Sequence, residues 1–369
     1  MSQDRVSPLW DAMEAVGGVS ADYHGRRLMR HFGDPSGAYE AATSGVVVFD
    51  RSHRARIAVT GRAPGQMLSG ILTGSMPKEP TEHGGEVLGG EATYHAVLTV
   101  KGRMLSDLWL MLRGDEESAG FLLDVPVAGV AALLENFKKF LPPRLARAKD
   151  VSEDTAMITV AGPAAAGVLS RLALGLRVGS DELVALGEGE WRLAGSSAVD
   201  GLAVIKTAEV WPEAYSVVGP AALVSAVWRA AVAEGVRPAG HGVWSTHRVE
   251  AGRPVFGTDM NDGTIPIEAG IHDRAIDYEK GCYTGQEVII RIRDRGHVNR
   301  HLRQLLLGDV PTPANRTELL AEDSDKAVGW ITSAVLSPKF EQTVALAYVR
   351  RGVGTVRLDG RSIAVPAGE

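Results

Sequence analysis

The chain has 369 residues and a formal net charge of −6, with 45% hydrophobic and 23% charged residues. This length exceeds what one hydrophobic core usually organises, so we expect two or three domains. The negative net charge argues against general nucleic-acid binding. No stretch approaches the ~18 apolar residues needed to span a bilayer, and the N-terminus carries acids without an apolar run. The sequence therefore predicts a cytoplasmic protein without membrane association.

The first half of the chain alternates between strand and helix patterns. Five runs with apolar or alternating residues are expected to be strands: 46–49, 55–60, 94–100, 104–112 and 120–125. We expect the first two to pair with each other and the last three to form an antiparallel meander. A short helix is expected over 63–72. A longer amphipathic helix over 127–141 ends at two prolines.

A second cycle of strands and helices follows, and then a region of strands only. Helices are expected over 163–176 and 220–235, each opened by proline. The remaining strands are expected at 156–160, 202–207, 215–219, 302–308, 327–336, 343–349 and 355–365. The last of these holds Asp359-Gly360, a strong signal for a two-residue hairpin. Together the patterns predict an α+β protein with a β-rich C-terminal module.

The only cysteine, Cys282, stands in 278-YEKGCYTGQEVIIRIRDRGHVNR-300. One cysteine excludes an internal disulfide and a cysteine-based zinc or four-cysteine cluster site, and the histidine spacing predicts no metal site. Free cysteine is often a small buried hydrophobe. However, Lys280 is close, and Thr284 with Glu287 matches a capping box that places the thiol before a helix N-terminus. Both features favour a thiolate. A strand over 289–293 is the alternative to this helix.

Two further features suggest ligand-binding residues. The stretch from Arg291 to Arg303 contains five arginines and one aspartate, which suits either a solvated face or a site for carboxylate or phosphate. It has no interleaved aromatic residues, which argues against RNA. Asp107 lies on the apolar strand face of 104-MLSDLWLML, where a carboxylate needs a partner. Its ligand could be the amino-pyrimidine edge of a pterin, and Glu209 is a weaker candidate of the same kind.

The motif 280-KGCYTGQE-287 resembles the signature K-G-C-x-x-G-Q-E of the YgfZ family of folate-binding proteins. The order of the segments around it is similar to that family and to its relative, the glycine cleavage T-protein, an aminomethyltransferase. These segments are 248-RVEAGRPVFGTD, 266-PIEAG, 295-RGHVNRHL and 329-GWITSAVLSP. The T-protein lacks the cysteine motif, so Cys282 places the chain nearer to YgfZ.

The resemblance implies a three-domain fold, in which two interleaved α+β domains surround a folate hole and a C-terminal antiparallel β-barrel follows. The implied boundaries are 1–52 with 153–245, 53–152 with 246–298, and 299–369. The implied cofactor is tetrahydrofolate. Its expected contacts are Asp107, Glu209, Arg248, Tyr283, Gln286 and Arg295. The residues expected to act in catalysis are Cys282, Lys280 and Asp107.

The resemblance also implies a function. The first hypothesis is a tetrahydrofolate-binding accessory protein for iron–sulfur cluster assembly or repair, linked through it to tRNA modification. Its partners would be iron–sulfur proteins or their assembly factors, and Cys282 would be a surface thiolate. The second hypothesis is a folate-dependent aminomethyl or one-carbon transferase. A third hypothesis rests on the basic run from Arg291 to Arg303 and not on the resemblance: an RNA or protein adaptor that uses this run, although nucleic acid is not expected as a direct ligand.

Overall fold

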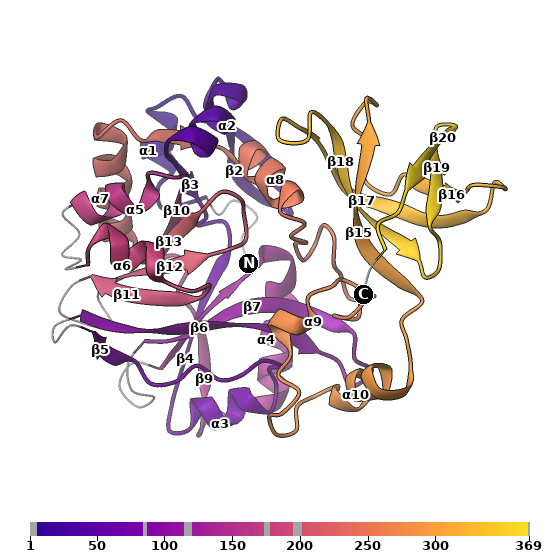
Figure 1. Cartoon of the computed structure of the whole chain (residues 1–369). Coiled ribbons are helices and arrows are strands. Elements are labelled where there is room, and N and C mark those ends of the chain that lie inside the picture. Colours follow the sequence, from indigo (N-terminus) through magenta and orange to yellow (C-terminus); the bar gives the residue numbers. More distant parts are fainter. Residues whose placement is uncertain (1–5, 84–86, 114–119, 173–177, 195–200, 368–369) are drawn as a thin grey trace.

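The computed structural model describes residues 6–83, 87–113, 120–172, 178–194 and 201–367. Two lobes of strands and helices meet at the centre of the molecule, and a third lobe of strands lies beside them (Figure 1). None of the helices in this described part is long and apolar enough to cross a membrane.

A large, mostly antiparallel sheet runs through the first two lobes. Twelve described strands form it, in the order β14-β3-β10-β13-β12-β11-β6-β7-β8-β4-β9, with β5 paired to β6. Only β14 and β3 are parallel neighbours among these pairs. The bounds are β3 Val47–Asp50, β4 Ala55–Thr60, β5 Thr81–His83, β6 Val87–Leu98, β7 Met104–Leu112, β8 Phe121–Val125, β9 Arg147–Asp150, β10 Thr155–Ala161, β11 Glu190–Ala194, β12 Leu202–Thr207, β13 Ala214–Pro220 and β14 Arg237–Ala239.

The chain crosses between the two halves of this sheet. It leaves β3 in the first half, crosses at 51–54, and enters β4 in the second half. It returns through 151–154 to β10, which lies beside β3. The predicted pairing of 46–49 with 55–60 is therefore wrong, because β3 pairs with β10 and β14, and β4 pairs with β8 and β9. The predicted meander is confirmed as β6-β7-β8.

Helices pack against the sheet and form two main cores with it. One core includes β10, β13 and α7, and the other includes β4, β7, β8 and α4. The helices are α1 Trp10–Glu14, α2 Pro35–Ser44, α3 Pro64–Ser69, α4 Val127–Phe140, α5 Ala165–Arg171, α6 Ser180–Ala185, α7 Ala221–Ala233, α8 His241–Glu250, α9 His272–Ala275 and α10 Gln286–Arg295. The end of the helix predicted over 163–176 lies outside the described residues. A separate hairpin joins β1 Val19–Tyr23 to β2 Arg26–His31.

The C-terminal lobe is a curved antiparallel sheet, called the C-terminal barrel below. Its strand order is β15-β18-β17-β16-β19-β20. The bounds are β15 Arg300–Gly308, β16 Glu318–Ala321, β17 Ala327–Ser337, β18 Gln342–Arg350, β19 Thr355–Leu358 and β20 Arg361–Ala364. The hairpin predicted at Asp359-Gly360 is confirmed, and both residues have the positive φ of a type I′ turn, +49° and +78°.

The α+β class with a β-rich C-terminal module is thus confirmed. The helix expected after Cys282 is also confirmed. Residues 289–293 belong to α10, so the alternative of a strand there is wrong. The domain boundaries implied by the resemblance remain a prediction. We propose to keep them, because the crossings at 51–54 and 151–154 lie close to the implied limits.

Candidate functional site

A polar pocket lies where the two halves of the large sheet meet α8, α9 and the loop after α8. It has about 410 Å³ of empty space, part of it open to solvent. Its walls bring together residues that are far apart in the sequence, among them the predicted site residues Asp107, Glu209 and Arg248. We call it the central pocket. Its remaining lining residues are Arg54, Tyr94, Trp244, Arg253, Pro254, Val255, Phe256 and Arg274.

Asp107 is the most unusual residue of the central pocket. It is buried, and its Oδ2 accepts a hydrogen bond of 2.5 Å from the hydroxyl of Tyr94. The other oxygen, Oδ1, is buried and has no hydrogen-bond partner among the described residues. Burial raises the pKa of Asp107, although Arg54 and the Tyr94 hydrogen bond oppose this shift. A ligand that offers N–H donors would satisfy the free oxygen.

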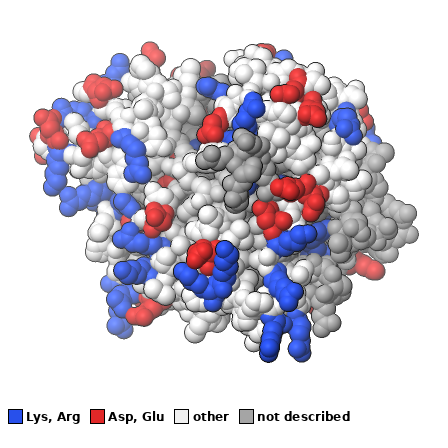
Figure 2. Space-filling model, turned by 180° about the vertical axis from the view of Figure 1, so that it is seen from behind, with Lys and Arg blue, Asp and Glu red and all other residues white. Residues whose placement is uncertain are grey.

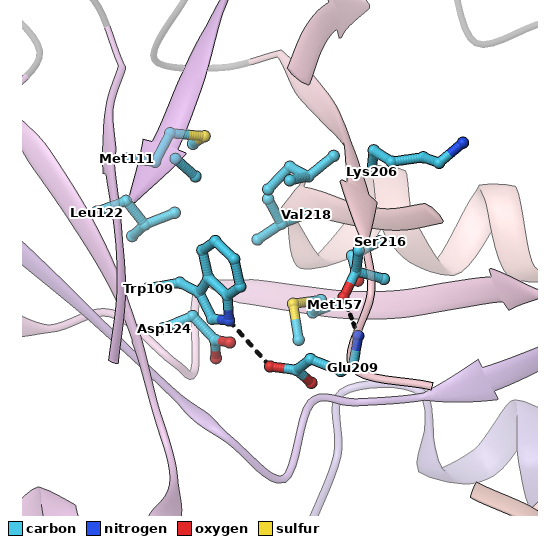
Figure 3. Close-up of a pocket in the computed structure, with 12 residues that line it drawn as sticks. Trp109, Met111, Leu122, Asp124, Met157, Lys206, Glu209, Ser216 and Val218 are labelled. Carbon is cyan, nitrogen blue, oxygen red and sulfur yellow. Dashed lines mark hydrogen bonds between the residues drawn. The ribbon is translucent and has the colours of Figure 1, made fainter. Parts of the chain in front are cut away.

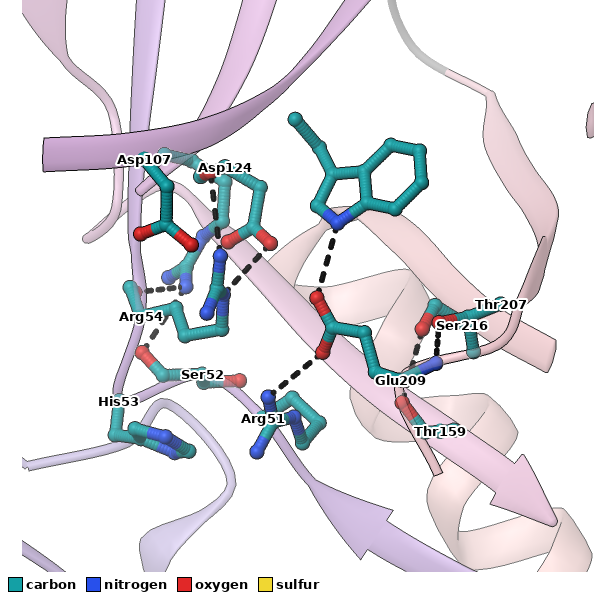
Figure 4. A network of polar contacts seen from close by, with 12 residues as sticks. Arg51, Ser52, His53, Arg54, Asp107, Asp124, Thr159, Thr207, Glu209 and Ser216 are labelled. Atoms are coloured by element: carbon teal, nitrogen blue, oxygen red, sulfur yellow. Dashed lines mark hydrogen bonds and ion pairs between the residues drawn. The ribbon is translucent and has the colours of Figure 1, made fainter. Parts of the chain in front are cut away.

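A second carboxylate in the wall, that of Glu209, has a hydrogen-bond partner for each of its oxygens. Glu209 accepts hydrogen bonds from the indole N–H of Trp109 at 2.9 Å and from Arg51 at 3.3 Å (Figure 4). Burial alone would raise the pKa of Glu209, but Arg54, Arg51 and the Trp109 hydrogen bond outweigh it and lower the pKa. Glu209 is therefore held as a carboxylate.

Arg54 is a cation close to these acids, and it pairs with a third one. Its Nε donates a hydrogen bond of 2.7 Å to Asp124 on β8, and the close-up shows its side chain between Asp107 and Asp124 (Figure 4). Burial raises the pKa of Asp124, and Arg54 opposes that shift. Arg51 stacks over the ring of Trp244, with its guanidinium carbon 3.6 Å from the centroid. Burial lowers the pKa of Arg51 to about 10.

Sequence reasoning missed Arg51, Arg54 and Asp124. Both arginines belong to the crossing at 51–54, which lies at the seam between the two halves of the sheet, and this crossing is not visible in the local pattern. Asp124 had the same signal as Asp107, because it is a single acid in the apolar strand 120-GFLLDV. Tyr94 and Arg274 were missed because nothing in their local patterns marks them as polar lining.

An apolar pocket adjoins the central pocket on the other side of Trp109 and Glu209. It has about 540 Å³ of empty space, part of it open to solvent. The side chains of Met111 and Leu122 face those of Met157 and Val218 across it (Figure 3). Its polar edge carries Asp124, whose Oδ1 is buried and has no partner among the described residues. The two pockets together can hold a flat apolar ring with polar edges.

Arg248 reaches the central pocket but is anchored elsewhere. Its guanidinium donates to Asp259 at 2.8 Å and to the Ser333 hydroxyl of the C-terminal barrel at 2.7 Å. Asp259 also accepts hydrogen bonds of 2.6 Å from Thr332 and Ser333. Arg248 therefore joins the barrel to the pocket, and its ion pair with Asp259 supports the wall.

Comparison with known proteins identifies the family. Residues 10–280 match the family model described as the GCVT N-terminal domain, and residues 300–367 match the glycine cleavage T-protein C-terminal barrel domain. The chain belongs to the glycine cleavage T-protein family. This is a family of folate-binding proteins.

Curated members of the T-protein family resemble the chain along most of its length. The aminomethyltransferase of Rubrobacter xylanophilus is 28% identical, over 94% of this chain and 87% of the relative. The aminomethyltransferase of Moorella thermoacetica is 27% identical, over 98% of this chain and 93% of the relative. The crystal structure of aminomethyltransferase T from Bartonella henselae has a TM-score of 0.81 at 20% identity, and covers 98% of this chain and 96% of that chain. The predicted T-protein-like fold is thereby confirmed.

The cysteine motif, residues 280–287, contributes no residue to the lining of the central pocket or of the apolar pocket. Cys282 is exposed, so the buried-hydrophobe interpretation of the thiol is wrong. Lys280 points to a neighbouring loop, where its amine donates hydrogen bonds to the carbonyls of Leu72 and Gly74 at 2.8 and 2.9 Å. Burial lowers the pKa of Lys280 to about 8. Tyr283 is buried in an apolar cluster.

The predicted capping box is wrong. The N-cap of α10 is Gly285, which has a φ of +86°, and no side chain caps the helix. Glu287 instead pairs with Arg291 one turn later, at 2.7 Å. Gln286 is the first residue of α10 and Arg295 is the last. Arg295 is exposed to solvent. The roles predicted for Lys280, Cys282, Tyr283, Gln286 and Arg295 stay predictions.

The basic run is mostly neutralised by neighbouring acids. Arg291 pairs with Glu287, Arg293 with Asp294, and Arg300 with Glu268. The face seen in Figure 2 carries Lys and Arg side chains interspersed with Asp and Glu. The ion pairs of the run fit the solvated-face interpretation better than a nucleic-acid surface.

Proposed function

We propose that this protein binds tetrahydrofolate in the central and apolar pockets, and that it uses the exposed Cys282 in a folate-dependent step that serves iron–sulfur proteins. The observation that carries the folate part is the buried, unpartnered Oδ1 of Asp107. A buried carboxylate oxygen without a donor is costly, and this cost is removed when a ligand supplies one.

The lining residues fit a reduced pterin. The adjacent N–H donors of an amino-pyrimidine edge suit a carboxylate such as Asp107 or Asp124, each of which has a free oxygen. The Met111 and Leu122 side chains offer an apolar surface for the ring. Tyr94 fixes the orientation of Asp107 through Oδ2. When bound, tetrahydrofolate would supply the carrier for a one-carbon unit.

The exposure of Cys282 supports the second part of the proposal. An exposed thiol is accessible to a partner protein, whereas a buried one is inert. The segment just before the motif is hydrogen-bonded to the loop that holds Thr73, beside the wall of the central pocket. The hydroxyl of Thr73 donates to the carbonyl of Ala275, next to the pocket residue Arg274, and the backbone N–H of Asp277 donates to the carbonyl of Thr73 at 3.0 Å.

The test is complementation of a strain that lacks the gene. We expect the wild-type chain to restore the activity of iron–sulfur enzymes, and both Cys282→Ala and Asp107→Asn to fail while folding normally. Full restoration by Cys282→Ala would show that the thiol has no role. Anaerobic calorimetric titration with tetrahydrofolate tests the folate part separately, with saturable one-site binding as the expected result.

The second candidate is aminomethyl transfer, and the curated relatives named aminomethyltransferase favour it. In that case 5,10-methylenetetrahydrofolate should form when an aminomethyl donor is supplied, and Asp107→Asn should abolish its formation. Cys282→Ala should then leave turnover unchanged. This pattern distinguishes the transferase from the accessory function.

A further inference from the structure

Arg56 is the most deeply buried charged residue in the described part of the chain, and the proposed function gives it no role. It is the second residue of β4 and is 0% exposed. An arginine keeps its charge inside a protein, and burying that charge is costly unless its N–H donors find acceptors. Acceptors for Arg56 lie in the two segments, 51–54 and 151–154, through which the chain crosses between the halves of the large sheet. We call these segments the first and the second crossing.

The guanidinium of Arg56 joins the two crossings. In the first crossing it donates hydrogen bonds to the carbonyl of Ser52 at 3.0 Å and to the carbonyl of Arg54. In the second crossing it donates to the carbonyl of Ser152 at 2.9 Å. Directly after that crossing, it donates to the carbonyl and the hydroxyl of Thr155, both at 3.1 Å. The backbone N–H of Arg56 also donates to the Ser152 hydroxyl at 2.8 Å. Arg56 thus fastens the two crossings to each other.

The first crossing carries two cations that contact acids of the central and apolar pockets (Figure 4). Arg51 pairs with Glu209 at 3.3 Å, and Arg54 pairs with Asp124 at 2.7 Å. Arg56 binds the carbonyl of Arg54, and so holds the backbone from which this cation projects. A displacement of about 1 Å takes even the shorter of these pairs out of hydrogen-bond range. The ion pairs therefore depend on how firmly the first crossing is anchored.

We propose that Arg56 is a positioning residue of the folate site, because it fastens the first crossing and so keeps Arg51 and Arg54 against Glu209 and Asp124. This inference rests on the proposed function in naming folate as the ligand, whereas the placement of the two cations can be tested without a ligand. Arg56 itself is not among the described lining residues of either pocket. Its effect on a ligand therefore passes through the two arginines.

Glu209 reports where these cations lie. Burial raises the pKa of Glu209, but Arg54, Arg51 and the hydrogen bond from Trp109 outweigh it and lower the pKa. The charged side chains that face Glu209 from the surrounding elements are Arg51, Arg54, Arg274, Asp107 and Asp124. If the first crossing moves away, the burial and the two neighbouring acids remain while the cations retreat. The pKa of Glu209 should then rise.

The first test follows the indole N–H signal of Trp109 by NMR while the pH is lowered, in the full chain with isotope-labelled tryptophan. This N–H donates to Glu209 at 2.9 Å, so its signal senses the charge of the carboxylate. Trp109→Phe assigns the signal, and Glu209→Gln identifies the part of the titration that belongs to Glu209. No folate is present in this measurement.

The variant to compare is Arg56→Lys. Lysine keeps the charge but carries its donors on one nitrogen, so it cannot reach the acceptors of both crossings. We expect the midpoint of the Glu209 titration to rise by about one pH unit. Arg56→Gln, a second variant that loses the fork of donors, should shift it in the same direction. The matched control is Arg192→Lys, since Arg192 is a buried arginine that donates to Glu182 at 2.9 Å and to the Trp191 carbonyl at 3.0 Å, outside both crossings. This control should leave the midpoint unchanged.

The second test is anaerobic calorimetric titration of the same proteins with tetrahydrofolate. At neutral pH, Arg56→Lys should bind about tenfold more weakly than the wild type, which corresponds to the loss of one charge-assisted hydrogen bond. The difference should widen as the pH falls, because Glu209 takes up its proton at a higher pH in the variant. Arg192→Lys should keep the wild-type affinity and the wild-type pH profile.

An unchanged Glu209 titration in both Arg56 variants would overturn the inference, whatever happens to folate binding. An equal shift in Arg192→Lys would also overturn it, because the shift would then follow from a general loss of stability. A shift confined to the Arg56 variants, in a wild-type chain that binds no tetrahydrofolate, would support the positioning of the cations and overturn the proposed function. A shift together with weaker binding supports both.

Discussion

Asp107 and Tyr94 lie on the neighbouring strands β7 and β6, and the Tyr94 hydroxyl donates a hydrogen bond of 2.5 Å to Oδ2 of Asp107. The other oxygen of Asp107 is buried without a partner among the described residues. The carboxylate is therefore oriented but only half satisfied. Such a group destabilises the folded chain, and a binding role explains its presence.

Asp107→Asn is expected to weaken tetrahydrofolate binding about 10- to 100-fold, because a charge-assisted hydrogen bond of about 1.5–3 kcal/mol is lost. The same change should not lower the free energy of unfolding, since it removes a poorly satisfied buried charge. Calorimetric titration and urea unfolding measure the two effects. Asp262→Asn, at an exposed position, should change neither. A large loss of stability in Asp107→Asn would indicate a structural carboxylate instead.

The stability of the chain should also depend on pH through Asp107. Burial raises the pKa of Asp107 in the folded state, so the folded chain holds this proton more tightly than the unfolded chain does. The resulting stabilisation is present below the unfolded pKa of about 3.9 and is lost as the pH rises through the raised folded value. The stability of the wild type relative to Asp107→Asn should therefore be lowest at neutral pH and increase toward pH 4. Urea unfolding of both proteins across this range provides the measurement, and a constant difference would contradict it.

Arg54→Met is expected to destabilise the chain by about 3–5 kcal/mol, because it leaves the carboxylate of Asp124 buried without its cation. The side chains of this pair are only 7% and 17% exposed. The pair of Arg237 and Asp34 is the matched control, with side chains 44% and 57% exposed. Arg237→Met should cost less than about 1 kcal/mol. Urea unfolding of both variants makes the comparison, and similar losses would mean that Arg54 is not an electrostatic anchor.

The thiol of Cys282 should react in the folded protein. Because the residue is exposed, one thiol per chain should be titrated by a disulfide reagent without denaturant. Cys282→Ser should change the free energy of unfolding by less than about 0.5 kcal/mol, as is usual at exposed positions. A thiol that reacts only after unfolding would contradict the exposed position.

The central pocket could be predicted from the sequence only in part. Asp107 was recognisable because a carboxylate on an apolar strand face needs an explanation. Arg51 and Arg54 were not, because their position depends on the chain crossing between two half-sheets. Local residue patterns specify strands but not which strands become neighbours. Glu209 was a weaker candidate from its local pattern, the resemblance to a known family supplied the ligand role of Arg248, and the fold places both in the pocket that holds Asp107.

The start of α10 shows a different limit of sequence reasoning. Thr284 and Glu287 have the spacing of a capping box, but Gly285 between them adopts a positive φ, and the helix begins only at Gln286. A spacing rule assumes ordinary backbone geometry and does not detect such a turn. The close approach of Gly285 to the β6–β7 turn gives the physical reason for the glycine.

Gly285→Ala is expected to destabilise the docking of α10. A Cβ at this position would lie 2.5 Å from the carbonyl oxygen of Thr99 and 3.1 Å from Cβ of Leu98, and the φ of +86° is itself unfavourable for alanine. The backbone term alone costs about 1–2 kcal/mol. Gly281, in the same motif, has no positive φ, and its Cβ would meet nothing within 4 Å.

Gly281→Ala is therefore the matched control and should change the free energy of unfolding by less than about 0.5 kcal/mol. Hydrogen exchange of the α10 amides should accelerate in Gly285→Ala and stay at the wild-type rate in Gly281→Ala, because only the first change pushes the start of the helix away from Thr99. Equal exchange in both variants would show that α10 is not held by this contact. In that case the position of Cys282 would have to be fixed by the hydrogen bonds of Lys280 to Leu72 and Gly74 instead.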